Sequence, residues 1–186
     1  MGDLIRWVSH RVRRKPVTLC DSDVHWSNKG RKDGMNTIGI RVKPGEVTFA
    51  VCDADAGIII NVEAIKIPKA LSAPDALKYV RNNILDVLRE YSIDSAGLRV
   101  TESNAQQMSV ERIEIEGVIQ EAFASSCLKS YYVGQIASIS RRLGFPRDQF
   151  KRYVSNEISY DAVENWGALK PEAREAIFAA LGARNA

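Results

Sequence analysis

The stretch Leu98-Arg99-Val100-Thr101-Glu102 predicts a short buried strand at residues 98–100, followed by an acid at the carboxyl end of the strand. A strongly amphipathic helical pattern precedes this stretch, and a second long helical segment follows it. We therefore expect the remaining elements to pack around this strand. Any chemistry is expected at its carboxyl end, where Glu102 stands.

Three strands are predicted earlier in the chain. Residues 37–42 and 47–52 are apolar, β-branched runs, and the Pro-Gly pair between them predicts a β-hairpin turn. Residues 58–67 form a third strand after a second turn, so the three strands are expected to form an antiparallel meander.

A helix is predicted between the meander and residues 98–100, beginning after Ser72 and ending near Tyr91. Ser72 suits the N-cap, and Pro74 and Asp75 suit the first turn. Its apolar residues recur at helical spacing on one face, at Leu77, Val80, Ile84, Leu88 and Tyr91. Because a helical crossover separates them, residues 98–100 can lie parallel to an earlier strand.

Further helices and one strand are predicted beyond Glu102. Ser109 is expected to cap the first of these helices, whose apolar face holds Ile115, Ile119, Ala122 and Ser126. A short strand at residues 131–133 comes next. The remaining helices are predicted at residues 135–143, 147–155 and 171–182, and glycines end the first and the last of them.

The first 34 residues differ in composition from the rest. They hold eight basic and four acidic side chains, a balance of +4, so a whole chain of +3 leaves −1 for the other 152 residues. Such a polar segment buries too little apolar surface to order itself, which predicts a disordered basic leader and a folded domain at residues 35–186. Met35 is a candidate for the true start, upstream of which the leader would lie; a basic arm that touches nucleic acid is the alternative.

The three cysteines, Cys20, Cys52 and Cys127, have no paired or metal-like spacing. The chain also lacks a secretory pattern and any apolar run near the ~18 residues of a membrane span. These features predict reduced thiols in a cytoplasmic protein with no membrane segment. Cys52 and Cys127 lie in apolar runs and are expected in the core.

The order of the predicted elements resembles that of ribonuclease H-like proteins, and its details are most similar to the RuvC-type resolvase branch. Ile38-Gly39-Ile40 resembles the family's first-strand Gly-Ile-Asp, and Val100-Thr101-Glu102 resembles the fourth strand, which ends in a catalytic glutamate. Three further motifs follow in the family's order: Glu116-Gly117-Val118-Ile119, Tyr131-Tyr132-Val133 with the basic helix after it, and Glu172-Ala173-Arg174-Glu175-Ala176. The resemblance covers about residues 36–181 and implies an α/β fold with a mixed five-stranded sheet flanked by helices.

The resemblance also implies two magnesium ions held by four carboxylates, since hard divalent ions take oxygen ligands. The candidate catalytic residues are Glu102, which is also the candidate metal ligand, Glu172 and Glu175, with Asp161 and Glu164 as a second option for the C-terminal acids. The chain departs from the family at Arg41, which stands where the central aspartate is expected. A guanidinium group cannot ligate magnesium, so we expect a degraded site without a cofactor, in which Arg41 pairs with Glu102.

A basic group at residues 141–152 is the densest one outside the leader. Arginines beside aromatic residues, here Phe145 and Tyr153, suit phosphate contact and base stacking, although a charge run is also typical of a solvated surface. The candidate nucleic-acid-binding residues are Arg141, Arg142, Arg147, Lys151 and Arg152.

Together these features favour a catalytically inactive, resolvase-like protein that binds structured or branched DNA or RNA, or a protein partner. Two alternatives stay open. One is an active magnesium-dependent, structure-specific nuclease of the Holliday-junction resolvase kind, and the other is a structural subunit with no nucleic-acid role. A homodimer is compatible with each of them.

Overall fold

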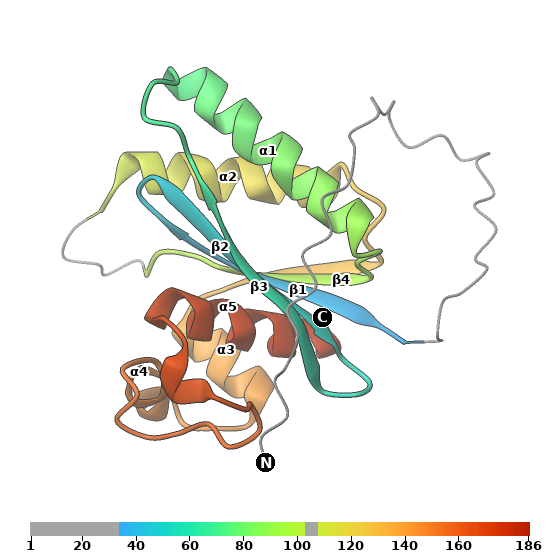
Figure 1. The fold of residues 1–186 in the computed structure, drawn as a ribbon, viewed down its shortest axis with the longest axis vertical. Coiled ribbons are helices and arrows are strands. Elements are labelled where there is room, and N and C mark those ends of the chain that lie inside the picture. Colours follow the sequence, from blue (N-terminus) through green and yellow to red (C-terminus); the bar gives the residue numbers. More distant parts are fainter. Residues whose placement is uncertain (1–33, 103–107) are drawn as a thin grey trace, which may run out of the picture.

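Five strands form one mixed sheet with helices on both faces (Figure 1). The computed structural model describes residues 34–102 and 108–186, so only Gly34 of the predicted leader at residues 1–34 falls within it. The strands are β1 (Asn36–Lys43), β2 (Glu46–Asp53), β3 (Ile58–Lys66), β4 (Ser95–Arg99) and β5 (Ser130–Gly134). Their order across the sheet is β3-β2-β1-β4-β5, which places β1 at the centre.

The pairing of the strands confirms the predicted topology. β1 pairs with β2, and β2 with β3, in antiparallel fashion, whereas β4 lies parallel to β1 and β5 lies parallel to β4. The parallel pair β1–β4 places Arg41 directly opposite Arg99. The predicted α/β fold with a mixed five-stranded sheet is therefore correct, and the carboxyl ends of β1, β4 and β5 meet at one edge of the molecule.

The position of β4 differs from its prediction at residues 98–100. The strand begins at Ser95 and ends at Arg99, so Glu102 lies three residues beyond its end. The first half of β4 carries no large apolar residue because a helix packs directly on its backbone. A Cβ added to Gly97 would lie 2.4 Å from the carbonyl oxygen of Ala179. A strand that is buried by small residues has no apolar pattern to reveal it.

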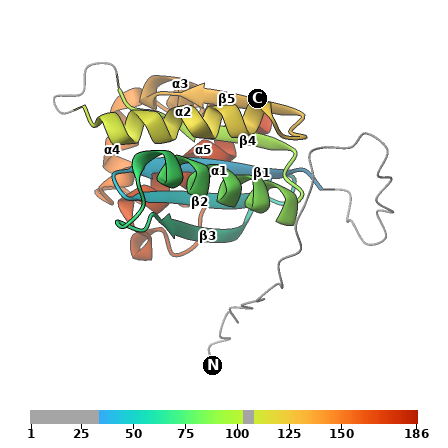
Figure 2. The same cartoon turned by 90° about the horizontal axis from the view of Figure 1, so that it is seen from above.

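Two helices cover one face of the sheet, and three cover the other (Figures 1 and 2). The first layer holds α1 (Ala73–Glu90) and α2 (Val110–Ala124). The second holds α3 (Ile136–Leu143), α4 (Arg147–Val154) and α5 (Pro171–Gly182), with the short 3-10 helices η1 (Trp166–Ala168) and η2 (Ala183–Asn185). Each layer encloses its own apolar core against the sheet.

Local signals explain where these helices begin and end. The hydroxyl of Ser109 accepts a hydrogen bond from the backbone N–H of Arg112, as the predicted cap of α2 requires. Gly144 ends α3 in the left-handed conformation, with a φ of 76°, which glycine adopts without strain. None of the helices within the two described ranges combines the length and apolar character of a membrane span.

The backbone of α5 packs directly on the backbone of the central strand β1. A Cβ added to Gly39 in β1 would lie 2.0 Å from the carbonyl oxygen of Ala176 and 2.1 Å from the backbone nitrogen of Ala180. Only glycine therefore lets α5 approach β1 so closely. This contact sets the distance between α5 and the sheet, and it thereby determines the position of Glu175 on α5.

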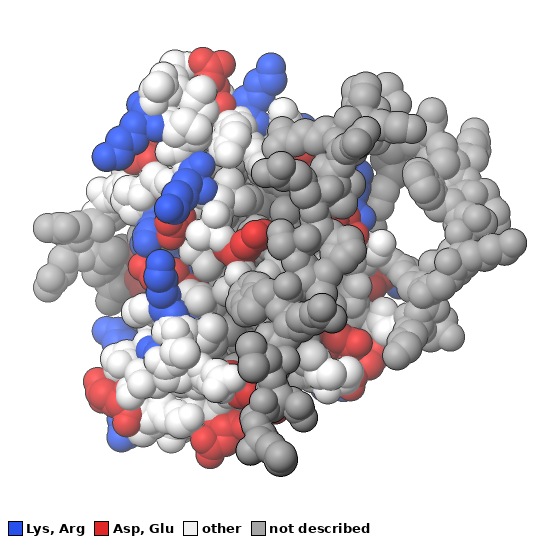
Figure 3. All heavy atoms as spheres, in the orientation of Figure 1, with Lys and Arg blue, Asp and Glu red and all other residues white. Residues whose placement is uncertain are grey.

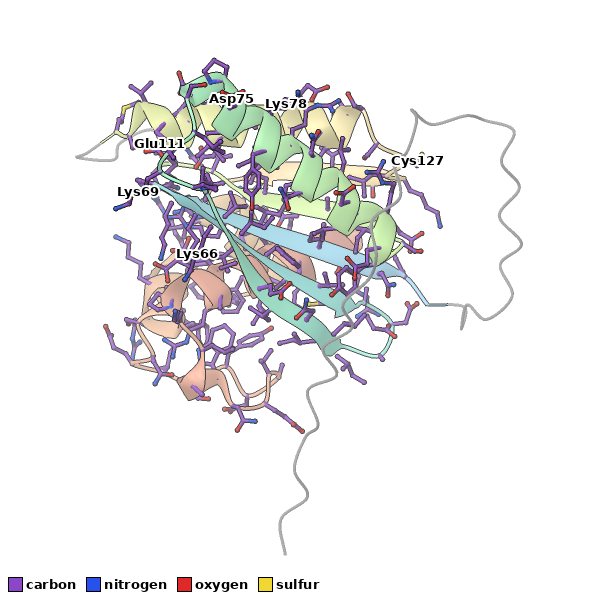
Figure 4. The ribbon with its side chains drawn as sticks, turned by 45° about the horizontal axis from the view of Figure 1, so that its top comes forward. Lys66, Lys69, Asp75, Lys78, Glu111 and Cys127 are labelled. Atoms are coloured by element: carbon purple, nitrogen blue, oxygen red, sulfur yellow. The ribbon has the colours of Figure 1, made fainter. Side chains whose placement is uncertain are left out.

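The two cysteines within the described range lie in different environments. Cys52 on β2 is fully buried, as predicted. Cys127 is exposed, so its predicted place in the core is wrong; it follows the end of α2, at the far end of that helix from Glu111 (Figure 4). The apolar residues before Cys127 belong to the helix, and the cysteine itself lies in the turn after it.

Candidate functional site

Two arginines stand side by side at the carboxyl ends of the central parallel strands. Arg41 near the end of β1 and Arg99 at the end of β4 are register partners. Both are largely buried, with 13% and 6% of their side-chain surface exposed. Each also donates a hydrogen bond to the carbonyl of the residue after it. Arg41 could be singled out from the sequence, but Arg99 could not, because it lies between the apolar Leu98 and Val100.

Glu175 on α5 approaches both arginines with the same oxygen. Its Oε2 lies 2.5 Å from Nε of Arg41 and 3.3 Å from Nε of Arg99. None of these three atoms has a well-aligned hydrogen bond to another described atom, so the attraction is mainly between charges. The partner of Arg41 is thus Glu175 and not the expected Glu102, because the close packing of α5 on β1 brings Glu175 up to the arginine.

Glu102 lies at the same edge of the sheet and joins three elements. Its Oε1 accepts a hydrogen bond of 2.9 Å from the backbone N–H of Ile136, the first residue of α3. The same oxygen lies 3.4 Å from Nη2 of Arg99, and Oε2 lies 3.4 Å from Nη2 of Arg147. An acid at this place satisfies an N–H group of the first helical turn and suits the positive end of the helix dipole.

A second buried glutamate, Glu116 on α2, supports the segment between β4 and Glu102. Its carboxylate accepts hydrogen bonds of 3.0 Å from the backbone N–H and the hydroxyl of Thr101, and one of 2.8 Å from Nε of Arg112. This role of Glu116 was not predicted from the sequence. The available signal was the place of Glu116 on the apolar face of α2, one turn before Ile119, where an unpaired acid would be costly.

Burial governs the charges at this site. Burial is the largest influence on both guanidinium groups and lowers the pKa of Arg41 and of Arg99, while Glu175 acts in the opposite direction. In the part of the chain that the structure describes, no three acids, histidines or cysteines lie together as metal ligands would. Guanidinium groups pair with oxyanions and not with cations, so this arrangement favours anion contact over metal binding.

The other candidate acids lie apart from the arginine pair. Glu172, one turn before Glu175 on α5, pairs with Lys43 at 3.4 Å, and Lys43 also pairs with Glu46 at 3.0 Å. Asp161 and Glu164 are exposed in the segment between α4 and η1. The structure thus brings together Glu102 and Glu175 through Arg99, and it keeps Glu172 beside a lysine of its own.

The predicted nucleic-acid-binding residues lie on α3 and α4, and one of them, Arg147, pairs with Glu102. Arg141 and Arg142 line a hollow of about 630 Å³ at the ends of β4 and β5, and Arg147 and Lys151 line a second one of about 560 Å³ beside Ile136. Arg142 stacks over Tyr132, 4.2 Å from the ring centre, and Arg152 pairs with Glu157 at 3.7 Å. No described acid pairs with Arg141 or Lys151, which are exposed and available to a ligand.

The aromatic residues among these bases have a different role from the one predicted. Phe145 and Tyr153 pack against each other, with ring centres 5.2 Å apart, and against Phe178 of α5. Both are partly buried members of the core under the sheet. They therefore hold α4 on α5 and do not offer free ring faces to nucleic-acid bases.

Charges of both signs alternate over the surface at this end of the molecule. In the orientation of Figure 1, lysine and arginine side chains on the flank beside the β1–β2 turn stand next to acidic ones (Figure 3). The ion pairs of Lys43 belong to this pattern. Bases outnumber acids on α3 and α4, where residues 136–154 hold five basic side chains and one acid.

Comparison with known proteins identifies the fold. No protein-family model and no curated protein sequence matches the chain. The structure of RuvC from Thermus thermophilus is similar to this one, with a TM-score of 0.61 and 12% identity over 80% of this chain and 92% of that chain. T. thermophilus RuvC in complex with a Holliday junction substrate gives a TM-score of 0.62 at 11% identity over the same shares. The chain therefore has the ribonuclease H-like fold of RuvC.

Proposed function

We propose that this protein binds structured nucleic acid through its RuvC-like fold and does not cleave it. The observation that carries the proposal is the placement of Arg41 and Arg99 on either side of Glu175, at the carboxyl ends of β1 and β4. Two-metal cleavage of a phosphodiester needs carboxylate oxygens that are free to hold divalent cations. Here the oxygens of Glu175 and Glu102 already face guanidinium groups.

The binding half of the proposal rests on α3 and α4. Arg141 and Lys151 are exposed and unpaired within the described residues, and Arg147 reaches from α4 to Glu102 at the sheet edge. Lysine and arginine side chains of this kind contact phosphate groups and position a protein on a nucleic-acid backbone. The fold is shared with a protein whose structure was solved in complex with a Holliday junction substrate, which makes branched DNA the first ligand to test.

Fluorescence anisotropy with three labelled DNA probes tests this proposal: a four-way junction, a duplex and a single strand. We expect the junction and the duplex to bind more tightly than the single strand, because Phe145 and Tyr153 are partly buried against other aromatic rings and contribute little to base stacking. Affinity should fall by tenfold or more between about 50 and 200 mM salt, as for any ligand held by several phosphate contacts. Replacing magnesium with EDTA should leave the affinity unchanged.

Paired variants separate the basic surface from general charge effects. The double substitution Arg141→Glu/Lys151→Glu should lower junction affinity by at least about tenfold and reduce its salt dependence. The double substitution Lys78→Glu/Arg89→Glu is the matched control, since it changes the net charge by the same amount and both residues are accessible bases of α1, on the opposite face of the sheet. Cleavage of the junction in magnesium would replace the proposal with the active nuclease. A lack of binding to every probe at low salt would leave the structural-subunit interpretation.

A further inference from the structure

The outer edge of β5 offers unpaired backbone groups. β5 is the last strand of the sheet and pairs in parallel with β4 on one side. The carbonyl of Gly134 accepts from Val100 on the β4 side, so alternation along the strand turns the N–H and C=O groups of Tyr131 and Val133 to the outer side. Within the described residues no group bonds to these four atoms. An open edge of this kind accepts a further strand.

The side chains at this edge are apolar and accessible. Tyr131 is 44% exposed and Val133 is 38% exposed, on the side of the sheet that α2 covers. Tyr131 contacts Phe123 of α2, with ring centres 5.7 Å apart, so its ring is held in place. Alternating apolar side chains on one face of an extended segment would pack onto these two residues.

A hollow of about 630 Å³ lies at the carboxyl end of this edge. Val100 and Val133 give it an apolar side, and Ser138 and Arg141 give it a polar one. Arg141 has no acidic partner within the described residues. A hollow of this composition fits a segment whose apolar side chain is followed by a carboxylate, because the carboxylate would form a charge-assisted pair with Arg141.

The other edge of the sheet is less suited to accept a strand. β3 is longer, but its register against β2 shifts between Val51 and Cys52. It also carries Glu63 and Lys66, and charges and irregular register are the devices that protect edge strands from pairing. β5 pairs in regular register along its whole length and holds no charged residue.

The charges near β5 also favour a peptide over a second copy of the chain as the added strand. Twofold antiparallel pairing of β5 with itself, centred on Tyr132, would bring Lys129 of one copy opposite Gln135 of the other, at the hollow that holds Arg141. Bases from both copies would then meet there. A segment with an acid at this place has the complementary charge.

We propose that the β5 edge binds an extended peptide of a partner protein, which adds to the sheet as a further strand and places a carboxylate at Arg141. Apolar residues of the peptide lie on Tyr131 and Val133. This site goes beyond the proposed nucleic-acid function and uses Arg141 in common with it, so the two ligands compete.

Selection from a displayed library of random peptides of about ten residues tests this inference with the full chain. Selected peptides should alternate apolar residues and carry an acid toward one end. Val133→Pro removes the outward N–H at a position where an edge strand tolerates proline, and Arg141→Glu reverses the charge in the hollow. Each should weaken binding of a selected peptide by about tenfold or more, whereas Arg89→Glu should not. Val133→Pro should bind the junction as the wild type does.

Amide hydrogen exchange tests peptide binding on the wild-type protein, so the result does not depend on whether a variant folds. Binding of a selected peptide should protect the amides of Tyr131 and Val133 in the wild-type protein. Unchanged exchange at both amides would overturn the proposal, as would selected peptides without acids or equal affinity for Val133→Pro. A dimer that forms without peptide and is lost in Val133→Pro would replace the peptide with a second copy of the chain.

Discussion

Arg41 and Arg99 lie opposite each other on parallel strands, and both guanidinium groups face one oxygen of Glu175. Like charges in adjacent register destabilise a sheet, and burial adds the cost of removing each charge from water. Burial accordingly lowers the pKa of both arginines. Glu175 offsets these effects, so the three side chains form one electrostatic unit in which each charge depends on the others.

Removing the acid from this unit should reveal the energetic cost of burying the two arginines. Glu175→Gln leaves two largely buried guanidinium groups without a counter-charge, and we expect the free energy of unfolding to fall by about 3 kcal/mol. Glu172→Gln is the matched control one turn away on α5. Its pair with Lys43 is about one-third exposed, so the loss should stay below about 1 kcal/mol. Urea unfolding followed by circular dichroism measures both, and equal losses would show that the three charges do not act as a unit.

Exchanging the arginines for metal-compatible residues tests whether they exclude magnesium. Arg41→Asp alone supplies an acid but leaves Arg99 beside Glu175, so we expect magnesium binding only in the double variant Arg41→Asp/Arg99→Leu. Calorimetric titration should then detect weak binding that disappears when Glu102→Gln is added. Cleavage is not expected to return, since catalytic ligands must be placed to within about 0.5 Å. Magnesium binding to the wild type that Glu102→Gln abolishes would favour the active nuclease.

The elements with apolar periodicity could be predicted from the sequence. The meander, the face of α1 and the helix from Pro171 to Gly182 lie where the pattern placed them. The first half of β4 could not be predicted, because Ser95, Ala96 and Gly97 are all small; α5 packs on the backbone at Gly97, and Ala96 faces the core under α1 and α2. Small residues that are chosen for a close contact leave no hydrophobic pattern.

The location of the candidate site at the carboxyl ends of the central strands could be predicted from the sequence, but its individual ion pairs could not. Arg41 and Glu102 were correctly expected near the carboxyl ends of the central strands. The pairing of Arg41 with Glu175 depends on the height of α5, which the contact at Gly39 sets and which no local pattern encodes. Arg99 was missed because it lies between the apolar Leu98 and Val100, and Glu116 because it is one of several charged residues in the first turns of α2; the role of each becomes clear only once its partner is known.

Cys52 provides a titration test of the core between the sheet and α5. Burial raises the pKa of its thiol to about 12, whereas an unfolded cysteine titrates near 8.5. The folded state therefore keeps the neutral thiol while the unfolded state loses its proton. The resulting stability is complete below about pH 8.5 and is lost as the pH rises toward 12, by about 1.4 kcal/mol per unit for this one group.

Comparison with a variant that lacks this thiol isolates the effect from other alkaline titrations. The unfolding free energy of the wild type should fall relative to that of Cys52→Ala by about 1 to 2 kcal/mol between pH 8.5 and 10. Below pH 8 the difference between the two proteins should be constant. A constant difference across the whole range would mean that Cys52 titrates alike in the folded and unfolded states.

Gly39, where α5 contacts β1, should tolerate substitution poorly. A Cβ at Gly39 would lie 2.0 Å from a carbonyl oxygen and 2.1 Å from a nitrogen of the α5 backbone, and neither atom can move alone. Gly39→Ala should therefore lower the free energy of unfolding by about 3 kcal/mol or more and move Glu175 away from Arg41.

Gly117→Ala is the opposite case, because Gly117 lies on the exposed side of α2 with nothing within 4 Å of an added Cβ. It should stabilise the protein by about 0.5 to 1 kcal/mol. Thermal and urea unfolding of the two variants measure this contrast, and a folded, fully stable Gly39→Ala protein would show that α5 is not fixed by this contact.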